Sequence, residues 1–210
     1  SFFRREPLRL IRVGVVGVDH LHQPRRQRAQ LRRAEGVDVP KDRLLTLDEL
    51  AAGQAVEFCF VEAQQDSFDF VAEWVRAGGS LLMVGGYLSF QGIEAKANYR
   101  GTPLAEVLPV LMEVGDDREE TPEGSEASVT GDHEITRDMP QPWPSILGFH
   151  RLVAKEGAEV LATVGGHPLL VVGTHGAGRV AAFATDMGPH WLPRTFVEWP
   201  GYARLWQQLT

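Results

Sequence analysis

Short apolar runs rich in β-branched residues recur along the first half of the chain. Three of them predict buried strands, at Leu10–Val18, Ala55–Val61 and Ser80–Val84. Between the second and the third, Ser67–Ala77 carries apolar residues at helical spacing and ends at a pair of glycines, which predicts an amphipathic helix. A continuous apolar run is typical of a parallel strand that is covered on both faces.

Polar segments between these strands add two further predicted helices. Gln27–Glu35 is expected to be a helix whose arginines lie on its solvated side, and Thr46–Ala52 a short helix capped by Thr46. Strands that alternate with helices indicate right-handed parallel crossovers. The first half of the chain therefore predicts a layered α/β domain.

After Gly92 the pattern changes to short β-type runs. Four are predicted as strands and Gly173–Gly178 as a hairpin connection between the last two, before a final helix at Gly201–Leu209. The four strands are expected at Phe149–Ala154, Glu159–Val164, Pro168–Val172 and Arg179–Thr185. The sequence shows no internal repeat and no linker, so we expect one domain over residues 1–210.

Composition narrows the classes of partner. Hydrophobic residues make up 43% of the chain, charged residues 23%, and the net charge is −7. No apolar run approaches the roughly 20 residues that cross a bilayer, so we expect no membrane partner. The arginines near the N-terminus are interpreted as a solvated helix face, so no nucleic-acid partner is expected. A single cysteine, Cys59, excludes an internal disulfide and favours a cytoplasmic protein.

The most suggestive stretch is the turn that follows the third strand. The apolar run Ser80–Val84 stops at Gly85 and Gly86, and Tyr87 and Ser89 follow at once. Ligands of open α/β sheets bind at the carboxyl ends of strands. We therefore expect a binding site here, with Gly85 and Gly86 forming its turn and Tyr99 and Arg100 forming one wall. Asp186 is expected as a further ligand-binding residue.

An ordered series of motifs over about residues 70–210 resembles the class I glutamine amidotransferase-like family, in particular its putative glutamine amidotransferase and trehalose-utilisation-type branches. The residues that carry the resemblance are Trp74–Gly92, Tyr99–Pro103, Glu106–Val110, Asp132–Thr136, Val153–Lys155, Glu159–Ala162, Gly176–Phe183 and Asp186–Trp191. The resemblance implies a flavodoxin-like three-layer sandwich with a mostly parallel sheet and a β-rich C-terminal part. Residues 1–70 form a divergent N-terminal part of the same domain.

In active members of that family, a sharp turn after a strand carries a nucleophilic cysteine. We call the corresponding segment here, Gly85–Ser89, the elbow. It places Tyr87 where the cysteine would be, and a phenol with an ordinary pKa near 10 is a poor nucleophile for acyl transfer. The sequence thus predicts a domain that binds a small ligand or another protein, and that has no glutaminase activity.

Two alternatives remain open. One is a hydrolase in which Ser89 or Tyr87 is the nucleophile and His190, near Asp186, is the base. The other is a dinucleotide-binding oxidoreductase, because Arg12–His20, with glycines at 14 and 17, is similar to the nucleotide-binding half of the glucose–fructose oxidoreductase-like dehydrogenases. Cys59 lies in an apolar strand and is interpreted as a core residue.

No histidine, cysteine or acidic cluster has the spacing of a metal site, so we expect neither a metal nor a cofactor. The expected partner is a small molecule of unknown identity. The composition also allows a homo-oligomer.

Overall fold

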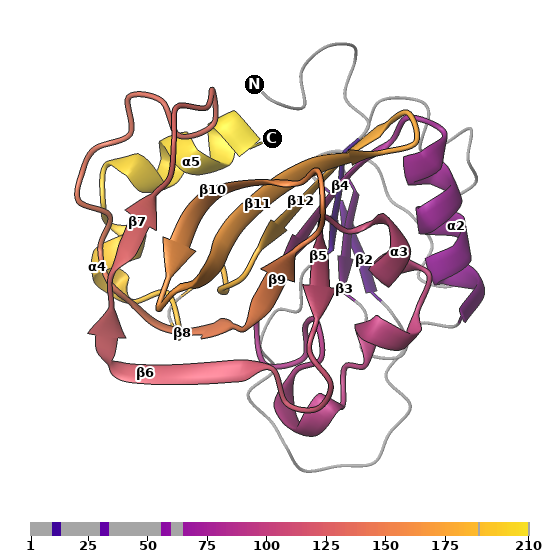
Figure 1. Ribbon diagram of the computed structural model, residues 1–210, viewed down its shortest axis with the longest axis horizontal. Coiled ribbons are helices and arrows are strands. Elements are labelled where there is room, and N and C mark those ends of the chain that lie inside the picture. The colour runs from indigo at the N-terminus through magenta and orange to yellow at the C-terminus, as the bar shows by residue number, and fades with distance from the viewer. Residues whose placement is uncertain (1–9, 14–29, 34–55, 60–64, 189, 210) are drawn as a thin grey trace.

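A computed structural model describes residues 10–13, 30–33, 56–59, 65–188 and 190–209, with side chains from Phe68 onward (Figure 1). Its main feature is an eight-stranded sheet with the order β2-β3-β1-β4-β12-β11-β10-β7. The strands are β1 Leu10–Val13, β2 Gln30–Arg33, β3 Val56–Cys59, β4 Ser80–Val84, β7 Ala127–Val129, β10 Glu159–Val164, β11 His167–His175 and β12 Gly178–Phe183.

The sheet is mixed rather than mostly parallel. Strands β3, β1, β4 and β12 pair in parallel with one another, whereas β2, β11, β10 and β7 pair antiparallel with their neighbours. The expected flavodoxin-like three-layer sandwich with a mostly parallel sheet is therefore wrong. The physical reason lies in the connections: β11 and β12 are joined by a two-residue turn, and so short a link can only return the chain antiparallel.

The structure also corrects the prediction for the arginine-rich segment. The part of Gln27–Glu35 that is described, Gln30–Arg33, is a strand that pairs antiparallel with β3. Pairing with a neighbouring strand overrides a local helical preference here. The helix expected at Thr46–Ala52 lies outside the described residues.

Helix α2, Gln65–Arg76, precedes β4 and ends where the sequence predicts. Its last turn closes through Gly78 and Gly79, whose N–H groups donate to the carbonyls of Val75 and Trp74. Gly78 has φ +115°, which favours glycine, and a Cβ at Gly79 would lie 2.3 Å from the Trp74 ring. The tight turn delivers the chain directly into β4.

Two small antiparallel sheets accompany the large one. Strand β5, Val110–Met112, pairs with β9, Leu152–Ala154, and β6, Arg118–Ser125, pairs with β8, Ile146–His150. The remaining helical segments are η1 Ile93–Ala95, η2 Tyr99–Gly101, α3 Leu104–Val107, α4 Arg194–Val197 and α5 Gly201–Leu209. Figure 1 shows α2 and α5 toward opposite ends of the molecule.

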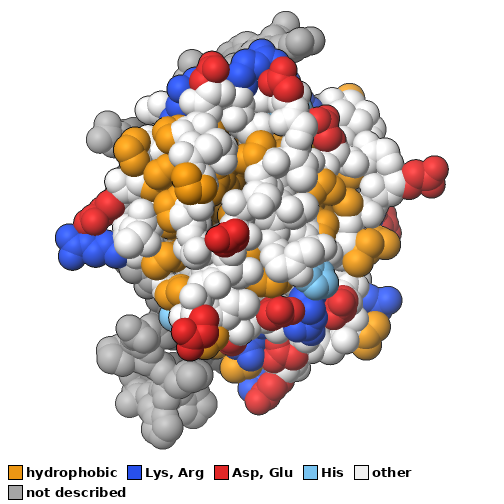
Figure 2. Space-filling view, turned by 60° about the vertical axis from the view of Figure 1, so that its left-hand side comes forward, with side chains coloured by type: hydrophobic (Ala, Val, Ile, Leu, Met, Phe, Trp, Pro, Cys, Tyr) orange, Lys and Arg blue, Asp and Glu red, His pale blue; other side chains and the backbone are white. Residues whose placement is uncertain are grey.

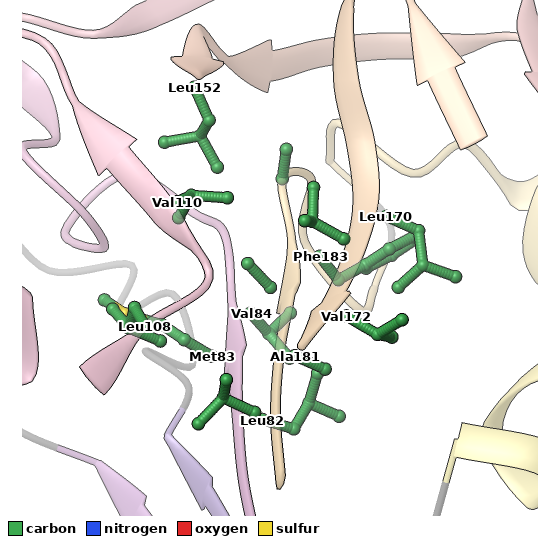
Figure 3. Close-up of a cluster of buried hydrophobic side chains, with 14 of the residues drawn as sticks. Leu82, Met83, Val84, Leu108, Val110, Leu152, Leu170, Val172, Ala181 and Phe183 are labelled. Atoms are coloured by element: carbon green, nitrogen blue, oxygen red, sulfur yellow. The ribbon is translucent and has the colours of Figure 1, made fainter. Parts of the chain in front are cut away.

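The core is centred on the parallel pair β4 and β12. All five residues of β4 are buried, and Leu82 and Met83 lie opposite Ala181 and Ala182 of β12. Figure 3 shows side chains of β5, β9 and β11 gathered around this pair, where they exclude water from both strands. The central strands therefore form a rigid base for the elbow, which follows β4.

The surface mixes charges of both signs with apolar side chains. Figure 2 shows positive and negative side chains close together, with apolar groups between them. Among the side chains that the structure describes, the large apolar groups of Val114, Leu111 and Val153 are more than half exposed. None of the helices in the described residues has the length and apolar character needed to cross a membrane.

Candidate functional site

The elbow begins where β4 ends against β12. Gly85 donates its N–H to the carbonyls of Phe183 and Thr185, at 2.8 and 3.0 Å. A Cβ at this position would lie 2.7 Å from the carbonyl oxygen of Ala184, so only glycine fits so close to the neighbouring chain. Gly86 follows with φ +145°, a conformation that favours glycine. The two predicted glycines thus form the turn.

Ser89 closes the turn from inside. Its side chain is buried and its hydroxyl donates to the carbonyl of Val84 at 2.6 Å. Its N–H donates to the carbonyl of Gly86 at 3.1 Å. The hydroxyl proposed as a nucleophile is therefore engaged with the backbone of β4.

Tyr87 projects from the tip of the elbow and is 40% exposed. Its ring packs edge-on against the ring of His190, with centroids 4.9 Å apart, and lies 5.8 Å from the ring of Trp191. The guanidinium carbon of Arg118 lies 4.6 Å from the Tyr87 ring centroid. The structure therefore brings together two of the three candidate catalytic residues, Tyr87 and His190.

The environment of Tyr87 keeps its phenol protonated at neutral pH. Burial raises the pKa of the Tyr87 phenol, and the charge of Glu120 and a hydrogen bond with it raise that pKa further. Arg118 acts in the opposite direction. A phenol whose pKa is raised above its ordinary value is a weaker source of phenolate.

His190 is half-exposed at the edge of this cluster. Its Nδ1 lies 3.8 Å from Oδ2 of Asp186. Asp186 accepts hydrogen bonds from the N–H groups of Trp191 and Leu192, at 2.9 and 2.8 Å. Burial raises the pKa of Asp186, and these hydrogen bonds and His190 oppose that rise. Asp186 thus shapes the segment that carries His190 and Trp191.

Tyr99 and Arg100 lie in η2, on the loop that follows the elbow. Tyr99 is buried, with its ring 5.6 Å from that of Phe68. Arg100 donates from Nε to the carbonyl of Met112 at 3.2 Å, and from its backbone N–H to the side chain of Gln91 at 3.0 Å. These contacts anchor the loop, and the wall predicted from these two residues stays a prediction.

The charged groups around Tyr87 form an ordered network. Arg118 donates from Nε and Nη2 to the two carboxylate oxygens of Asp116, at 3.0 and 2.8 Å. This pairing holds the pKa of Asp116 well below its usual range and raises the pKa of Arg118. Glu120 accepts a hydrogen bond from Nε1 of Trp191 at 3.0 Å. The network fixes Arg118 and Glu120 beside the exposed tyrosine.

A buried pair that the sequence did not reveal lies behind the elbow. His150 and Asp117 are fully buried, and Nδ1 of His150 lies 2.8 Å from Oδ1 of Asp117. Nε2 of His150 lies 2.9 Å from the carbonyl oxygen of Gly86 and 3.2 Å from its nitrogen. Asp117 also accepts the N–H groups of Gln91 and Gly92, at 3.1 and 2.9 Å.

This pair bears on the chemistry that the elbow can perform. An oxyanion site needs backbone N–H groups that point at the reacting atom. The N–H of Gly85 is bonded to two carbonyls and the N–H of Gly86 faces His150, so neither is available for that task. The elbow keeps the shape of a nucleophile turn without these two donors.

Several other predicted features lie elsewhere. The hypothesis of a dinucleotide site rests on the glycines at 14 and 17, which are outside the described residues. Cys59 is the last residue of β3, and its side chain is also outside the described part. Within the described ranges, no three histidine, cysteine, aspartate or glutamate side chains are arranged to hold a metal ion.

Comparisons with known proteins bear on the family. A family model described as putative glutamine amidotransferase matches residues 53–210. The chain is similar to the solved structure of the cytoplasmic protein STM1381 from Salmonella typhimurium LT2, with 32% identity, a TM-score of 0.71, and coverage of 95% of this chain and 97% of that one. It is also similar to the cytoplasmic protein STM3548 from Salmonella typhimurium, with 30% identity, a TM-score of 0.69, and coverage of 96% and 97%. A search of curated proteins found no match.

Proposed function

The chain belongs to the putative glutamine amidotransferase family, and we propose that its elbow binds a small molecule without glutaminase chemistry. The observation that carries the proposal is Tyr87 at the tip of the elbow. A family nucleophile would be a thiol at this place, and here the side chain is an aromatic ring that is 40% exposed.

Three features of the elbow support a loss of acyl transfer. The hydroxyl of Ser89 is bonded to the carbonyl of Val84, and the N–H groups of Gly85 and Gly86 are bonded to protein acceptors. The phenol of Tyr87 has a raised pKa. Acyl transfer requires a nucleophile, a means of activating it and an oxyanion site. In this elbow each of the three requirements is met less well.

The same residues provide what a binding surface needs. Tyr87 and His190 present rings at the surface, while Glu120 and Arg118 supply an acceptor and a cation held in place by Trp191 and Asp116. Aromatic groups next to a few fixed polar groups are typical of sites for small molecules. The ligand would contact Tyr87 and the groups beside it.

A screen for thermal stabilisation by small polar metabolites tests this proposal. Ligands that raise the melting temperature of the wild type are expected to lose about tenfold or more in affinity in Tyr87→Ala. Val114→Ala, which trims an apolar side chain outside the elbow, is the matched control and should bind as the wild type does. Hits that bind Tyr87→Ala unchanged would place the ligand elsewhere and contradict the proposal.

One observation favours the hydrolase alternative. The rings of Tyr87 and His190 are in contact, which places a phenol and an imidazole side by side in the same cluster. An ester such as p-nitrophenyl acetate is a suitable probe. Hydrolysis above the buffer rate that is lost in both Tyr87→Phe and His190→Ala would favour the hydrolase. Hydrolysis that survives in either variant would be unrelated to this pair.

We further propose that the protein acts in the cytoplasm, because the two similar solved structures are of proteins described as cytoplasmic. The face seen in Figure 2 carries charges of both signs, and it is not dominated by the positive charge that nucleic-acid or membrane partners favour. We also propose that the protein forms a homo-oligomer. The mass of the purified protein in solution tests this, because a mass equal to that of one chain would contradict it.

A further inference from the structure

We propose that His150 is a proton-operated switch of the elbow: its protonation selects which backbone group of Gly86 the buried ring holds. The inference concerns the shape of the elbow, so it stands whether or not a ligand binds there.

Asp117 determines the role of one ring nitrogen. Its carboxylate accepts the N–H groups of Gln91 and Gly92, which identifies it as an ionised acceptor. Nδ1 of His150, 2.8 Å from Oδ1, must then donate its hydrogen to Asp117. Because both side chains are fully buried, water does not compete for this bond.

The other ring nitrogen faces two groups of opposite character. Nε2 lies 3.2 Å from the nitrogen of Gly86 and 2.9 Å from its carbonyl oxygen. A neutral imidazole whose hydrogen is on Nδ1 has a lone pair at Nε2 and can accept only from the N–H of Gly86. An imidazolium has a hydrogen at Nε2 and can donate only to the carbonyl of Gly86.

The two alternative bonds hold different peptide groups. The N–H belongs to the peptide that joins Gly85 to Gly86, and the carbonyl to the peptide that joins Gly86 to Tyr87. Gly86 has φ +145° and, as a glycine, can change its backbone angles at little cost. We expect the change of bond to repel the group that is no longer held, and so to turn the elbow about Gly86 and shift Tyr87, the next residue.

Aromatic rings pack against the His150 side chain. The rings of Phe90 and Trp191 pack on His150, with centroids 4.9 and 5.1 Å away. Charged and titratable groups lie around this shell on four segments, and Asp117 is in direct contact with the ring. They are Asp116, Arg118 and Glu120 near the start of β6, Arg151 after β8, Tyr87 on the elbow, and Asp186 with His190 on the segment that carries Trp191.

Nuclear magnetic resonance on the isotope-labelled full chain tests the switch. The ring signals of His150 and the backbone amide of Gly86 are followed from about pH 4 to about pH 9, which brackets the ordinary titration of histidine. We expect the Gly86 amide to change with the same midpoint as the His150 ring. In His150→Gln, whose amide can still bond the backbone but cannot titrate, this change should disappear.

His190→Gln is the matched control, because His190 is the exposed histidine of the same cluster and packs on Tyr87. In that variant the Gly86 change should persist with the wild-type midpoint. The inference is overturned if Gly86 stays constant while His150 titrates, if His150 keeps one protonation state throughout, or if the change follows His190. Should His150→Gln fail to fold, the wild type and His190→Gln decide the question.

Discussion

His150 and Asp117, 33 positions apart in the sequence, meet inside the protein with 2.8 Å between Nδ1 and Oδ1. The pair connects the backbone of the elbow, through Gly86, to that of the following loop, through Gln91 and Gly92. A side-chain pair therefore holds the two ends of the segment that carries Tyr87. Its removal should affect both stability and the position of Tyr87.

Single substitutions in this pair are expected to be costly and not additive. His150→Ala and Asp117→Ala should each lower the free energy of unfolding by about 3–5 kcal/mol, because each leaves a buried polar partner unpaired. The double variant should lose less free energy of unfolding than the two single variants together. The reason is that the interaction is already broken once one partner has been removed. Urea unfolding of the four proteins gives the coupling directly.

The exposed pair Arg137 and Asp132 is a matched control for that cycle. Its atoms are 3.1 Å apart, but both side chains are more than half exposed. Its coupling should be too small to measure, because water screens the interaction. If the costs of His150→Ala and Asp117→Ala add up within about 0.5 kcal/mol, the two side chains do not act as a unit.

Gly85→Ala tests the close approach of the elbow to β12. The new Cβ would lie 2.7 Å from the carbonyl oxygen of Ala184, which is backbone and cannot rotate away. We expect a loss of about 1–3 kcal/mol in the free energy of unfolding. Gly188→Ala, near the same site, has open space for its Cβ and should be close to neutral. Equal stability of the two variants would mean that β4 and β12 separate easily here.

The pairing of Asp116 with Arg118 predicts a pH dependence. Arg118 lowers the pKa of Asp116 in the folded protein, so the folded state holds its proton less tightly than the unfolded chain does. The pair's contribution to stability is therefore complete above about pH 5 and is lost as the pH falls through the acid range.

Thermal unfolding between about pH 3 and about pH 7 can measure this contribution. In Arg118→Met, which keeps an unbranched side chain but removes the charge, the stability should fall less steeply with acid than in the wild type. An unchanged slope would show that Asp116 is not stabilised by Arg118. The effect should stay below about 1 kcal/mol, since Asp116 is partly exposed.

The sequence predicted the centre of the fold better than its periphery. The apolar run Ser80–Val84 and the glycines after it identified β4 and the elbow, because a buried strand that ends in a sharp turn leaves a clear local pattern. The direction of the neighbouring strands depends on long-range pairing. The mixed sheet and the strand at Gln30–Arg33 were therefore missed.

The residues of the candidate site also fall into those that the sequence predicted and those that it did not. Tyr87, Ser89 and His190 were singled out because they follow strand ends, and the structure places Tyr87 against His190 but directs the Ser89 hydroxyl into the backbone. Asp117 lies in an acidic run and His150 in the predicted strand Phe149–Ala154, so neither stood out. Only the pairing of β6 with β8 brings them together.

Ammonia release from glutamine by the purified full chain tests the central claim most directly. The elbow has a tyrosine in place of a thiol, and its two glycine N–H groups are engaged. We expect the wild type to release no more ammonia than a heat-inactivated sample. Sustained release that is lost in Cys59→Ala or in Tyr87→Phe would contradict the account.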